Sequence, residues 1–315
     1  MDRVAATRAA TSLITNVERV IKGKRSAVEA AATCLFAGGH LLLEDVPGVG
    51  KTMLARSMAR SVRGSFKRIQ ATPDLLPADI TGASVYNQAD GTFRFMPGPL
   101  FANVVLVDEI NRTTPRTQSA LLEAMDEGAV TVEGVRHPLP DAFFLIATQN
   151  PVEHHGTYPL PEGQLDRFAI AMDVGYVDAR TERDIVRAQL ASHPIEELEA
   201  VLSLDDVVGV RRQVRATHVE DDVLEYAMEL TRATRGHGDV ELGASPRASI
   251  TLVRCAQARA LLDGRDFVLP DDVKALAVSA LAHRIVAAAG MRLDPGRGAE
   301  IVTEIVSRIP VPVTG

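Results

Sequence analysis

A glycine-containing stretch that ends in a lysine and a threonine carries the clearest chemical signal in the chain. Residues 40–52 read HLLLEDVPGVGKT, an apolar run followed by two spaced glycines and a Lys-Thr pair. Gly48 and Gly50 allow the backbone to curl so that several N–H groups face one anion. Lys51 adds a cation for terminal phosphates, and Thr52 adds a hydroxyl for Mg²⁺. The order of strand, loop and helix start predicts a phosphate-binding loop.

One position departs from the usual form of this loop. The pattern G-x-x-x-x-G-K-[ST] begins with glycine, and Asp45 stands at that position here. We expect a helix from about Met53 to Val62, and its N-terminal dipole favours the same anion. The alternative is a plain glycine turn before a basic helix start. The phosphate loop is favoured because all its parts follow in the required order.

Residues 104–109 read VVLVDE, an apolar strand that ends in two carboxylates. In phosphate-loop ATPases such a strand lies beside the loop strand, and an aspartate at its end can hold Mg²⁺ through water. The next carboxylate can orient the attacking water. Because strand residues alternate faces, Asp108 and Glu109 can divide these roles. Alone, the segment also fits a strand that ends at the surface; together with the loop, it predicts the second half of a nucleotide site.

Three further polar residues stand where a phosphate or its attacking water could be contacted. Asn150 follows the apolar run 143–147 and can position water, although Asn-Pro is also an ordinary turn pair. Arg167 can stabilise charge on a γ-phosphoryl group, from the same or a neighbouring subunit, or form a structural pair with an aspartate. Arg247 opposes the dipole of the helix it begins, so a nucleotide or a carboxylate nearby would explain it.

Composition narrows the classes of protein that the chain can belong to. Its 315 residues suffice for two domains, and no apolar run approaches the length that membrane insertion requires. A net charge of −7, no basic block and 4% aromatic residues argue against a nucleic-acid partner. The first twenty residues lack the apolar block of a secretory signal. Two distant cysteines, Cys34 and Cys255, do not make a disulfide framework in a chain this long, which favours a cytoplasmic location.

Short apolar runs alternate with helical segments in the first part of the chain, which predicts an α/β fold with a parallel sheet. The expected strands lie at 41–44, 66–70, 104–107, 143–147 and 169–174. The expected helices, in addition to the one after the loop, lie at 3–20, 26–36 and 117–125. Two hairpins interrupt the alternation, at 83–96 with a turn at 89–91 and at 129–139 with a turn at 133–134.

After residue 178 we expect only helices. They lie at 179–191, 220–234, 247–262, 270–288 and 299–308, with one more that begins at Ser203. Asp206 follows Ser203 by three residues, as in a capping box. The predicted domains are therefore a nucleotide-binding domain with two hairpin inserts at 1–178, a linker at 179–200 and an all-helical lid domain at 201–315.

These segments together resemble AAA+ ATPases, and specifically the MoxR family. The similarity extends from about Val17 to Arg284. It is carried by GGHLLLEDVPGVGKT at 38–52, VDEINR at 107–112, TQSALLEAM at 117–125, ATQNP at 147–151, YPLPEGQLDRF at 158–168 and GASPR at 243–247. The resemblance implies an αβα sandwich with a helical lid, assembled as a homo-oligomer, a hexameric ring, with ATP and Mg²⁺ bound between subunits.

The resemblance also implies a role for each candidate residue. The nucleotide would be bound by Val46, Pro47, Gly48, Val49, Gly50, Lys51, Thr52 and Met53, with Ile21 and Gly23 near the adenine. Thr52 and Asp108 would hold Mg²⁺, and Glu109 would activate water. The other catalytic residues would be Asn150 as sensor 1, Arg167 as an arginine finger from a neighbouring subunit and Arg247 as sensor 2 on the lid.

Members of the MoxR family act as chaperone-like ATPases that mature or activate partner proteins. These clients often contain a von Willebrand factor A domain, and some require insertion of a metal cofactor. The alternatives are a magnesium-chelatase-like motor subunit, a DNA-remodelling relative and a nucleotide-gated binding module with little hydrolysis. The DNA alternative requires basic pore loops, and the hairpin at 84–96 contains only Arg94 as a cation. The intact Asp108-Glu109 pair argues against the binding module.

The loop at 152–156, VEHHG, departs from the expected family pattern by its two histidines. His154 and His155 could suggest a metal site, but no third ligand has a recognisable spacing, so a polar loop beside the subunit interface is favoured. The sequence does not identify the client. It also leaves open the ring size, whether assembly needs ATP, and whether the hairpins contact the client.

Overall fold

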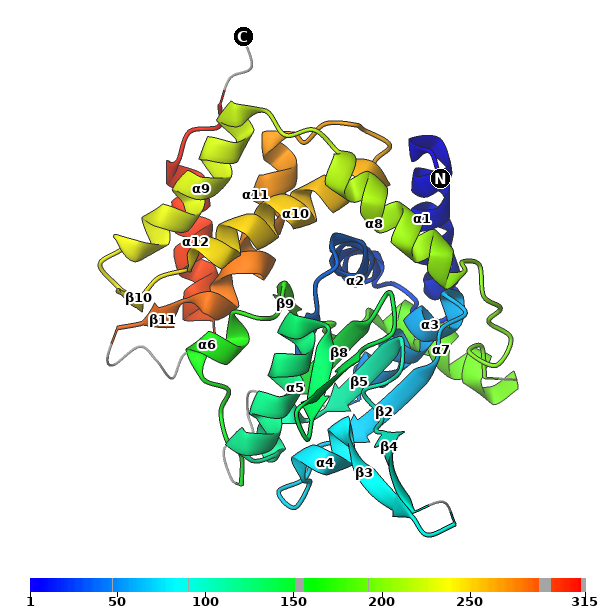
Figure 1. Ribbon diagram of the computed structural model, residues 1–315. Coiled ribbons are helices and arrows are strands. Elements are labelled where there is room, and N and C mark those ends of the chain that lie inside the picture. Colours follow the sequence, from blue (N-terminus) through cyan, green and yellow to red (C-terminus); the bar gives the residue numbers. More distant parts are fainter. Residues whose placement is uncertain (47, 90, 151–155, 192, 289–295, 313–315) are drawn as a thin grey trace.

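The computed structural model of the protein describes residues 1–46, 48–89, 91–150, 156–191, 193–288 and 296–312. Within these residues, five parallel strands form the central sheet in the order β2-β5-β8-β1-β9 (Figure 1). The strands are β1 (Leu41–Glu44), β2 (Phe66–Gln70), β5 (Val104–Asp108), β8 (Phe144–Gln149) and β9 (Ile170–Met172). All five predicted strands are therefore present, and the last is shorter than expected.

Helices cover both faces of this sheet because its strands are apolar on both sides. Leu41 and Leu43 pack into one core with the helices α1 (Arg3–Glu18), α2 (Arg25–Ala37) and α3 (Lys51–Ser61). Leu42, between them, packs into a second core with α5 (Pro115–Glu127). Neighbouring side chains of a strand point to opposite faces, so this division is what an αβα sandwich requires. The predicted fold class is confirmed.

The C-terminal region is helical, with α8 (Leu204–Ala216), α9 (Asp221–Arg235), α10 (Pro246–Leu262), α11 (Pro270–Leu281) and α12 (Arg297–Arg308). The predicted capping box begins α8, since Ser203 Oγ accepts from the Asp206 N–H at 3.2 Å and Asp206 Oδ2 accepts from the Ser203 N–H at 2.9 Å. The cores of this region and of the sheet are continuous, because Leu252 of α10 and Val210 of α8 belong to the same apolar cluster as Leu41. The boundaries at 178 and 200 stay a prediction.

Two details of the C-terminal region differ from the prediction. The helix expected at 270–288 ends at Leu281 and is followed by a 3-10 turn at Ala282–Arg284. The chain then becomes extended, and β11 (Val286–Ala287) pairs with β10 (Val240–Leu242). The helix ends there because Arg284 turns toward the sheet, where its guanidinium donates to the Phe168 carbonyl at 2.7 Å. The β-branched residues that follow suit a strand.

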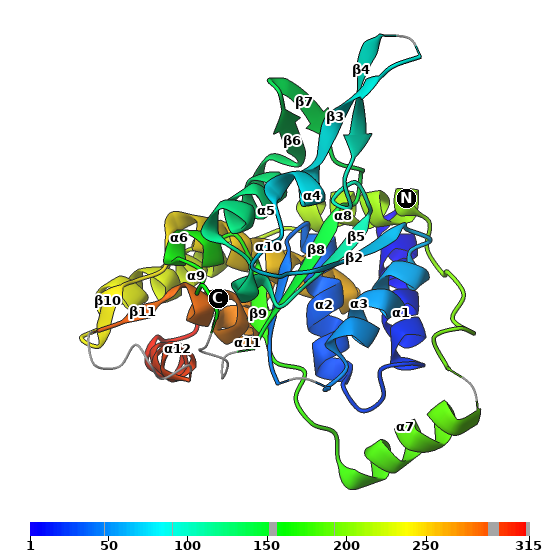
Figure 2. The same ribbon diagram turned by 90° about the horizontal axis from the view of Figure 1, so that it is seen from below.

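Both predicted hairpins are present, and they project side by side from the same end of the sheet (Figure 2). One joins β3 (Gly82–Asn87) and β4 (Thr92–Pro97), and the other joins β6 (Ala129–Val132) and β7 (Val135–Pro138). The rings of Phe95 and His137 stack with centroids 3.8 Å apart and so connect the two hairpins.

Helix α7 (Ala179–Ala191) projects from the body of the molecule (Figure 2), and its residue Thr181 lies near Gly23. The shorter helix α4 (Pro77–Thr81) packs on α5 and on the hairpin strand β3, and α6 (Glu162–Leu165) packs on the 3-10 turn at Ala282–Arg284. Cys34 and Cys255 are buried and unbridged. None of the helices described is both long and apolar enough to cross a membrane.

Candidate nucleotide-binding site

The residues predicted to bind and hydrolyse a nucleotide meet in one cavity of about 320 Å³ at the carboxyl end of the sheet. They come from three segments that are distant in sequence: the loop after β1, the end of β5 and the residue after β8. The cavity is lined by Gly48, Gly50, Lys51, Thr52, Met53, Asp108, Glu109 and Asn150. Ligands of open α/β sheets bind at this edge, and the volume is within the range of small-molecule sites.

The loop has the backbone geometry that the glycines predict. Gly48 and Gly50 have φ angles of 87° and 102°, a region that favours glycine, and a Cβ at either residue would meet no neighbour within 4 Å. Backbone conformation, and not lack of space, therefore requires glycine here. Helix α3 begins at Lys51, so its N-terminus faces the cavity. Val46 and Val49 flank the glycines without lining the cavity, and Pro47 lies outside the described residues.

The ammonium of Lys51 is held at the loop by a backbone carbonyl. Its Nζ donates to the Asp45 carbonyl oxygen at 2.5 Å. Burial lowers the pKa of Lys51, while the charges of Asp45, Asp108 and Glu109 act in the opposite direction. An anionic phosphate in the cavity would add to these charges and favour the protonated lysine.

Asp108 ends β5 with both carboxylate oxygens engaged. Oδ1 accepts from the Thr148 hydroxyl at 2.6 Å, and Oδ2 pairs with Arg68 of β2 at 2.6 Å. The same Thr148 oxygen accepts from the Glu109 N–H at 2.9 Å. One buried hydroxyl on β8 therefore positions both carboxylate residues. Sequence reasoning missed Thr148 and Arg68, although a threonine in an otherwise apolar strand was a visible signal.

Glu109 enters the cavity through a turn and not through strand alternation. It follows the last residue of β5 and has φ 58° and ψ 49°, a left-handed conformation that is uncommon outside glycine. Its Oε2 accepts from Gln70 Nε2 at 2.9 Å and pairs with Arg112 Nε at 3.3 Å. Asp108, as the last strand residue, and Glu109, through the turn, both line the one cavity, and the expected division of roles between them stays a prediction. Backbone strain of this kind is common at functional sites.

Asn150 lines the cavity directly after β8. Its neighbour Gln149 does not line the cavity, and its amide donates to Glu44 on the adjacent strand β1. The pKa of Glu44 is raised by burial, and the bond from Gln149 acts against that shift. His154 and His155 lie outside the described residues.

Ile21 and Gly23 do not line the cavity. Ile21 is 7% exposed and belongs to the core beside the sheet. Gly23 has φ 68°, and a Cβ there would approach Thr181 Cγ2 of α7 to 2.9 Å. The suggested contact of these two residues with an adenine stays a prediction.

Arg167 and Arg247 line a separate crevice of about 260 Å³ between the sheet and α10. Both arginines pair with Asp126 at the end of α5: Arg167 Nη1 lies 2.6 Å from Oδ2, and Arg247 Nη1 lies 3.0 Å from Oδ1. Asp166, the aspartate next to Arg167, instead pairs with Arg284 at 2.8 Å. The loop and these arginines therefore line different cavities of one subunit. Sequence reasoning missed Asp126.

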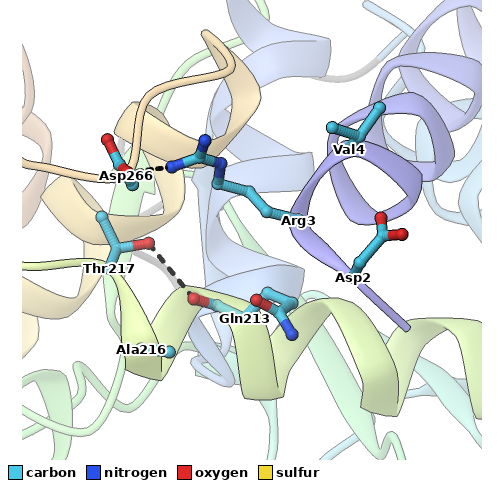
Figure 3. Close-up of a pocket in the computed structure, with 7 residues that line it drawn as sticks. All are labelled: Asp2, Arg3, Val4, Gln213, Ala216, Thr217 and Asp266. Carbon is cyan, nitrogen blue, oxygen red and sulfur yellow. Dashed lines mark hydrogen bonds and ion pairs between the residues drawn. The ribbon is translucent and has the colours of Figure 1, made fainter.

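A further depression lies at the N-terminus of α1, between α1 and α8 (Figure 3). There Arg3 pairs with Asp266, and the Thr217 hydroxyl donates to the Gln213 carbonyl at 3.2 Å. None of the predicted site residues lines it. The cavity at the phosphate loop is therefore the candidate site.

Known families match both parts of the chain. The ATPase family associated with various cellular activities (AAA) matches residues 40–170, and the AAA lid domain matches residues 232–305. The residues that line the nucleotide cavity lie within the first match, and Arg247 lies within the second.

Similar proteins cover nearly the whole chain. The uncharacterised protein YeaC of Bacillus subtilis is 50% identical over 300 residues, which cover 95% of this chain and 94% of YeaC. Chaperone MoxR1 of Mycobacterium tuberculosis is 39% identical over 308 residues, which cover 95% of this chain and 81% of MoxR1. A crystal structure of a candidate ATPase from Cytophaga hutchinsonii, 35% identical, has a TM-score of 0.90 and covers 99% of this chain and 97% of its own. The chain belongs to the MoxR family of AAA+ ATPases.

Proposed function

We propose that this chain binds ATP together with Mg²⁺ in the cavity at the phosphate loop and hydrolyses it to ADP and phosphate. The observation that carries the proposal is the convergence of Lys51, the Asp108–Glu109 pair and Asn150 on one cavity. A structural loop would have no need for a lysine, two carboxylates and an amide around one space.

The donor set fits Mg²⁺. Thr52 and Asp108 supply a hydroxyl and a carboxylate, and Mg²⁺ is typically held by few protein ligands, with water and phosphate oxygens completing its shell. Among the described residues, no group of three or more His, Cys, Asp or Glu residues is placed to hold a metal ion. When bound, the ion would neutralise phosphate charge. Glu109 would orient the attacking water, Asn150 would hold it, and Lys51 would contact the terminal phosphates.

Arg167 and Arg247 complete this site from a neighbouring subunit in our proposal. Both lie in a crevice separate from the loop of their own chain and are held together by Asp126. Guanidinium groups suit the charge that develops on a transferred phosphoryl group. A closed ring of identical subunits would place every crevice against a neighbouring loop, and we propose a hexamer.

We further propose that hydrolysis drives chaperone-like maturation of a partner protein, such as one with a von Willebrand factor A domain. The name of the relative MoxR1 supports the chaperone part of this proposal. Measurable release of phosphate would distinguish the proposed ATPase from a nucleotide-gated binding module with little turnover. Stimulation of that release by a chelatase complex would instead favour a magnesium-chelatase-like motor subunit.

Replacement of Glu109 by Gln tests the proposed chemistry. Glu109→Gln keeps the size of the side chain and removes the carboxylate, so ATP should still bind while phosphate release falls by about 10²- to 10³-fold. Glu123→Gln, the same exchange at an exposed position of α5, is the matched control and should leave turnover unchanged. Unchanged phosphate release in Glu109→Gln would remove this residue from the mechanism. The same variant, loaded with ATP, is the trap with which to isolate a client from cell extract.

A further inference from the structure

Asp45, the residue that replaces the first glycine of the loop pattern, has a carboxylate that is fully occupied by backbone N–H groups. Oδ1 accepts from Val46 at 2.7 Å, and Oδ2 accepts from Val174 at 2.9 Å and from Gly175 at 2.7 Å. The side chain is buried, with 9% of the residue exposed. A carboxylate with three such donors is well satisfied without a cation. It joins the phosphate loop to the chain that follows β9.

The backbone of the same residue contacts the phosphate-binding lysine. The Asp45 carbonyl accepts from Lys51 Nζ, and the Asp45 N–H donates to the Gln149 carbonyl at 3.2 Å. When the ammonium of Lys51 turns to a phosphate, it must give up or share its bond to the Asp45 carbonyl. A bound nucleotide would therefore change the bond that the Asp45 carbonyl accepts from Lys51. The Asp45 carboxylate, in turn, accepts from the N–H groups of Val174 and Gly175.

The chain after Gly175 leads directly to α7, which is loosely attached. Gly175 has φ 68°, Tyr176 is 80% exposed, and the Asp178 carboxylate caps α7 by accepting from the N–H groups of Arg180 and Thr181 at 2.9 Å each. None of the α7 side chains that the structure describes is buried, and α7 packs closely on no other described helix or strand (Figure 2). Segments with so few packed contacts move at low energetic cost.

This arrangement has a simple structural explanation, in which Asp45 only stiffens the loop. It also has the consequence that a shift of the loop changes the anchor point of α7, which connects the sheet to the helical region. The first explanation predicts an effect of Asp45 on stability alone. The second predicts that α7 responds to nucleotide and that this response depends on the Asp45 carboxylate.

We propose that Asp45 is a positioning residue that couples nucleotide binding at the phosphate loop to the placement of α7. The proposal rests on the proposed function in one respect, namely that ATP binds at this loop. It concerns the carboxylate and the N–H groups of Val174 and Gly175, which no catalytic role requires.

Hydrogen exchange of the full-length protein, with and without a non-hydrolysable ATP analogue and Mg²⁺, tests the coupling. In the wild type the analogue should change the exchange rates of amides in residues 176–191 by about fivefold or more. Asp45→Asn and Asp45→Gly should still bind a fluorescent ATP analogue, with a dissociation constant within about threefold to tenfold of wild type, and should lose the change in α7. Asp173→Asn removes a charge from the same segment but leaves the Asp45 bonds, so it should behave like the wild type.

Each result has a distinct meaning. Retention of the nucleotide-dependent exchange in both Asp45 variants would overturn the coupling, as would a wild type that binds the analogue without any change in α7. A wild type that fails to bind the analogue would overturn the proposed function, and this inference with it. Asp45→Asn keeps the shape of the side chain, so its thermal unfolding, compared with that of Asp45→Gly, separates lost coupling from lost folding.

Discussion

At the scale of single residues, the Thr148 hydroxyl sets the geometry of two charged neighbours at once. It donates to Asp108 and accepts from the backbone of Glu109, in a fully buried position. Removal of a buried partner leaves polar groups unsatisfied, which costs about 1–3 kcal/mol. The residue does not itself line the cavity, so its effect is exerted through the carboxylates.

Thr148→Val should therefore lower the turnover number by about tenfold while the dissociation constant for ATP stays nearly constant. Steady-state phosphate release and nucleotide titration measure the two quantities. Thr113→Val is the matched control, because Thr113 is equally buried but its hydroxyl has no hydrogen-bond partner among the described residues. Thr113→Val should keep wild-type turnover and stability. A loss of nucleotide affinity in Thr148→Val, without loss of turnover, would contradict the assignment.

The buried His40 and the half-buried His283 make the stability of the fold sensitive to acid. Burial lowers the pKa of His40 to about 4 and that of His283 to about 3. In the unfolded chain both titrate near the ordinary value of about 6.5. Below that pH the unfolded state therefore binds more protons than the folded state. The free energy of unfolding is therefore highest above the pKa of these histidines in the unfolded chain. It falls as the pH decreases toward their pKa values in the folded protein.

We expect the free energy of unfolding to fall by about 2 kcal/mol per histidine between pH 7 and pH 5. Urea denaturation across this range measures the change. The double variant His40→Gln, His283→Gln should be less stable at pH 7 but should show a flatter pH dependence. An equally steep dependence in the variant would assign the acid sensitivity to other groups.

The sequence predicts those site residues that lie next to one another in the chain and misses those brought in from other strands. Lys51 and the loop glycines belong to one contiguous pattern, and so does the Asp108-Glu109 pair. Thr148 and Asp126 acquire their roles only from the order of strands in the sheet and the end point of α5. That order depends on tertiary packing, which local patterns do not encode.

At the scale of elements, helix ends were predictable where a side chain caps them locally. The start of α8 follows from Ser203 and Asp206, which satisfy each other's backbone N–H groups. The end of α11 could not be predicted from the local sequence. It depends on Arg284, which leaves the helix and donates to Asp166 and to the Phe168 carbonyl, both distant in sequence.

Ser203→Ala should lower the free energy of unfolding by about 1 kcal/mol, because it removes the acceptor for the Asp206 N–H. Chemical denaturation monitored by circular dichroism measures this. Ser307→Ala is the control: Ser307 is exposed in α12 and its hydroxyl donates back to the Glu304 carbonyl of the same helix, so the change should be within about 0.5 kcal/mol of zero. Equal effects of the two substitutions would mean that the capping box contributes no stability.

At the scale of the whole molecule, one subunit keeps the cavity at the phosphate loop apart from the crevice that holds Arg167 and Arg247. The loop cavity and the Arg167–Asp126–Arg247 crevice are separate, and our proposal joins them through a second subunit. The sequence could not predict that the two cavities are separate. It places Arg167 near a strand but does not give the position of that side chain relative to the phosphate loop. The fold and the parallel sheet were predictable, whereas the relation between the cavities was not.

Mixing of two inactive variants tests this arrangement. Lys51→Ala and Arg167→Ala should each be inactive alone, and an equal mixture that forms mixed rings should regain about a quarter of wild-type activity, since that fraction of interfaces pairs an intact loop with an intact arginine. A mixture of Lys51→Ala with Glu109→Gln is the control and should stay inactive, because both residues line the same cavity. Co-purification through different tags verifies that mixed rings form. An inactive first mixture, in verified mixed rings, would place Arg167 in its own subunit's site.

The two buried cysteines have a practical consequence. Burial raises the pKa of Cys255 to about 12 and that of Cys34 well above its ordinary value, so neither thiol forms the thiolate that maleimides attack. The native chain should thus be nearly inert to thiol-reactive dyes without any engineering. Leu190 of α7 is 83% exposed, so Leu190→Cys would provide a single labelling position on a helix that packs closely on no other described helix or strand. Fluorescence from that position would follow α7 in real time, in a chain otherwise unaltered.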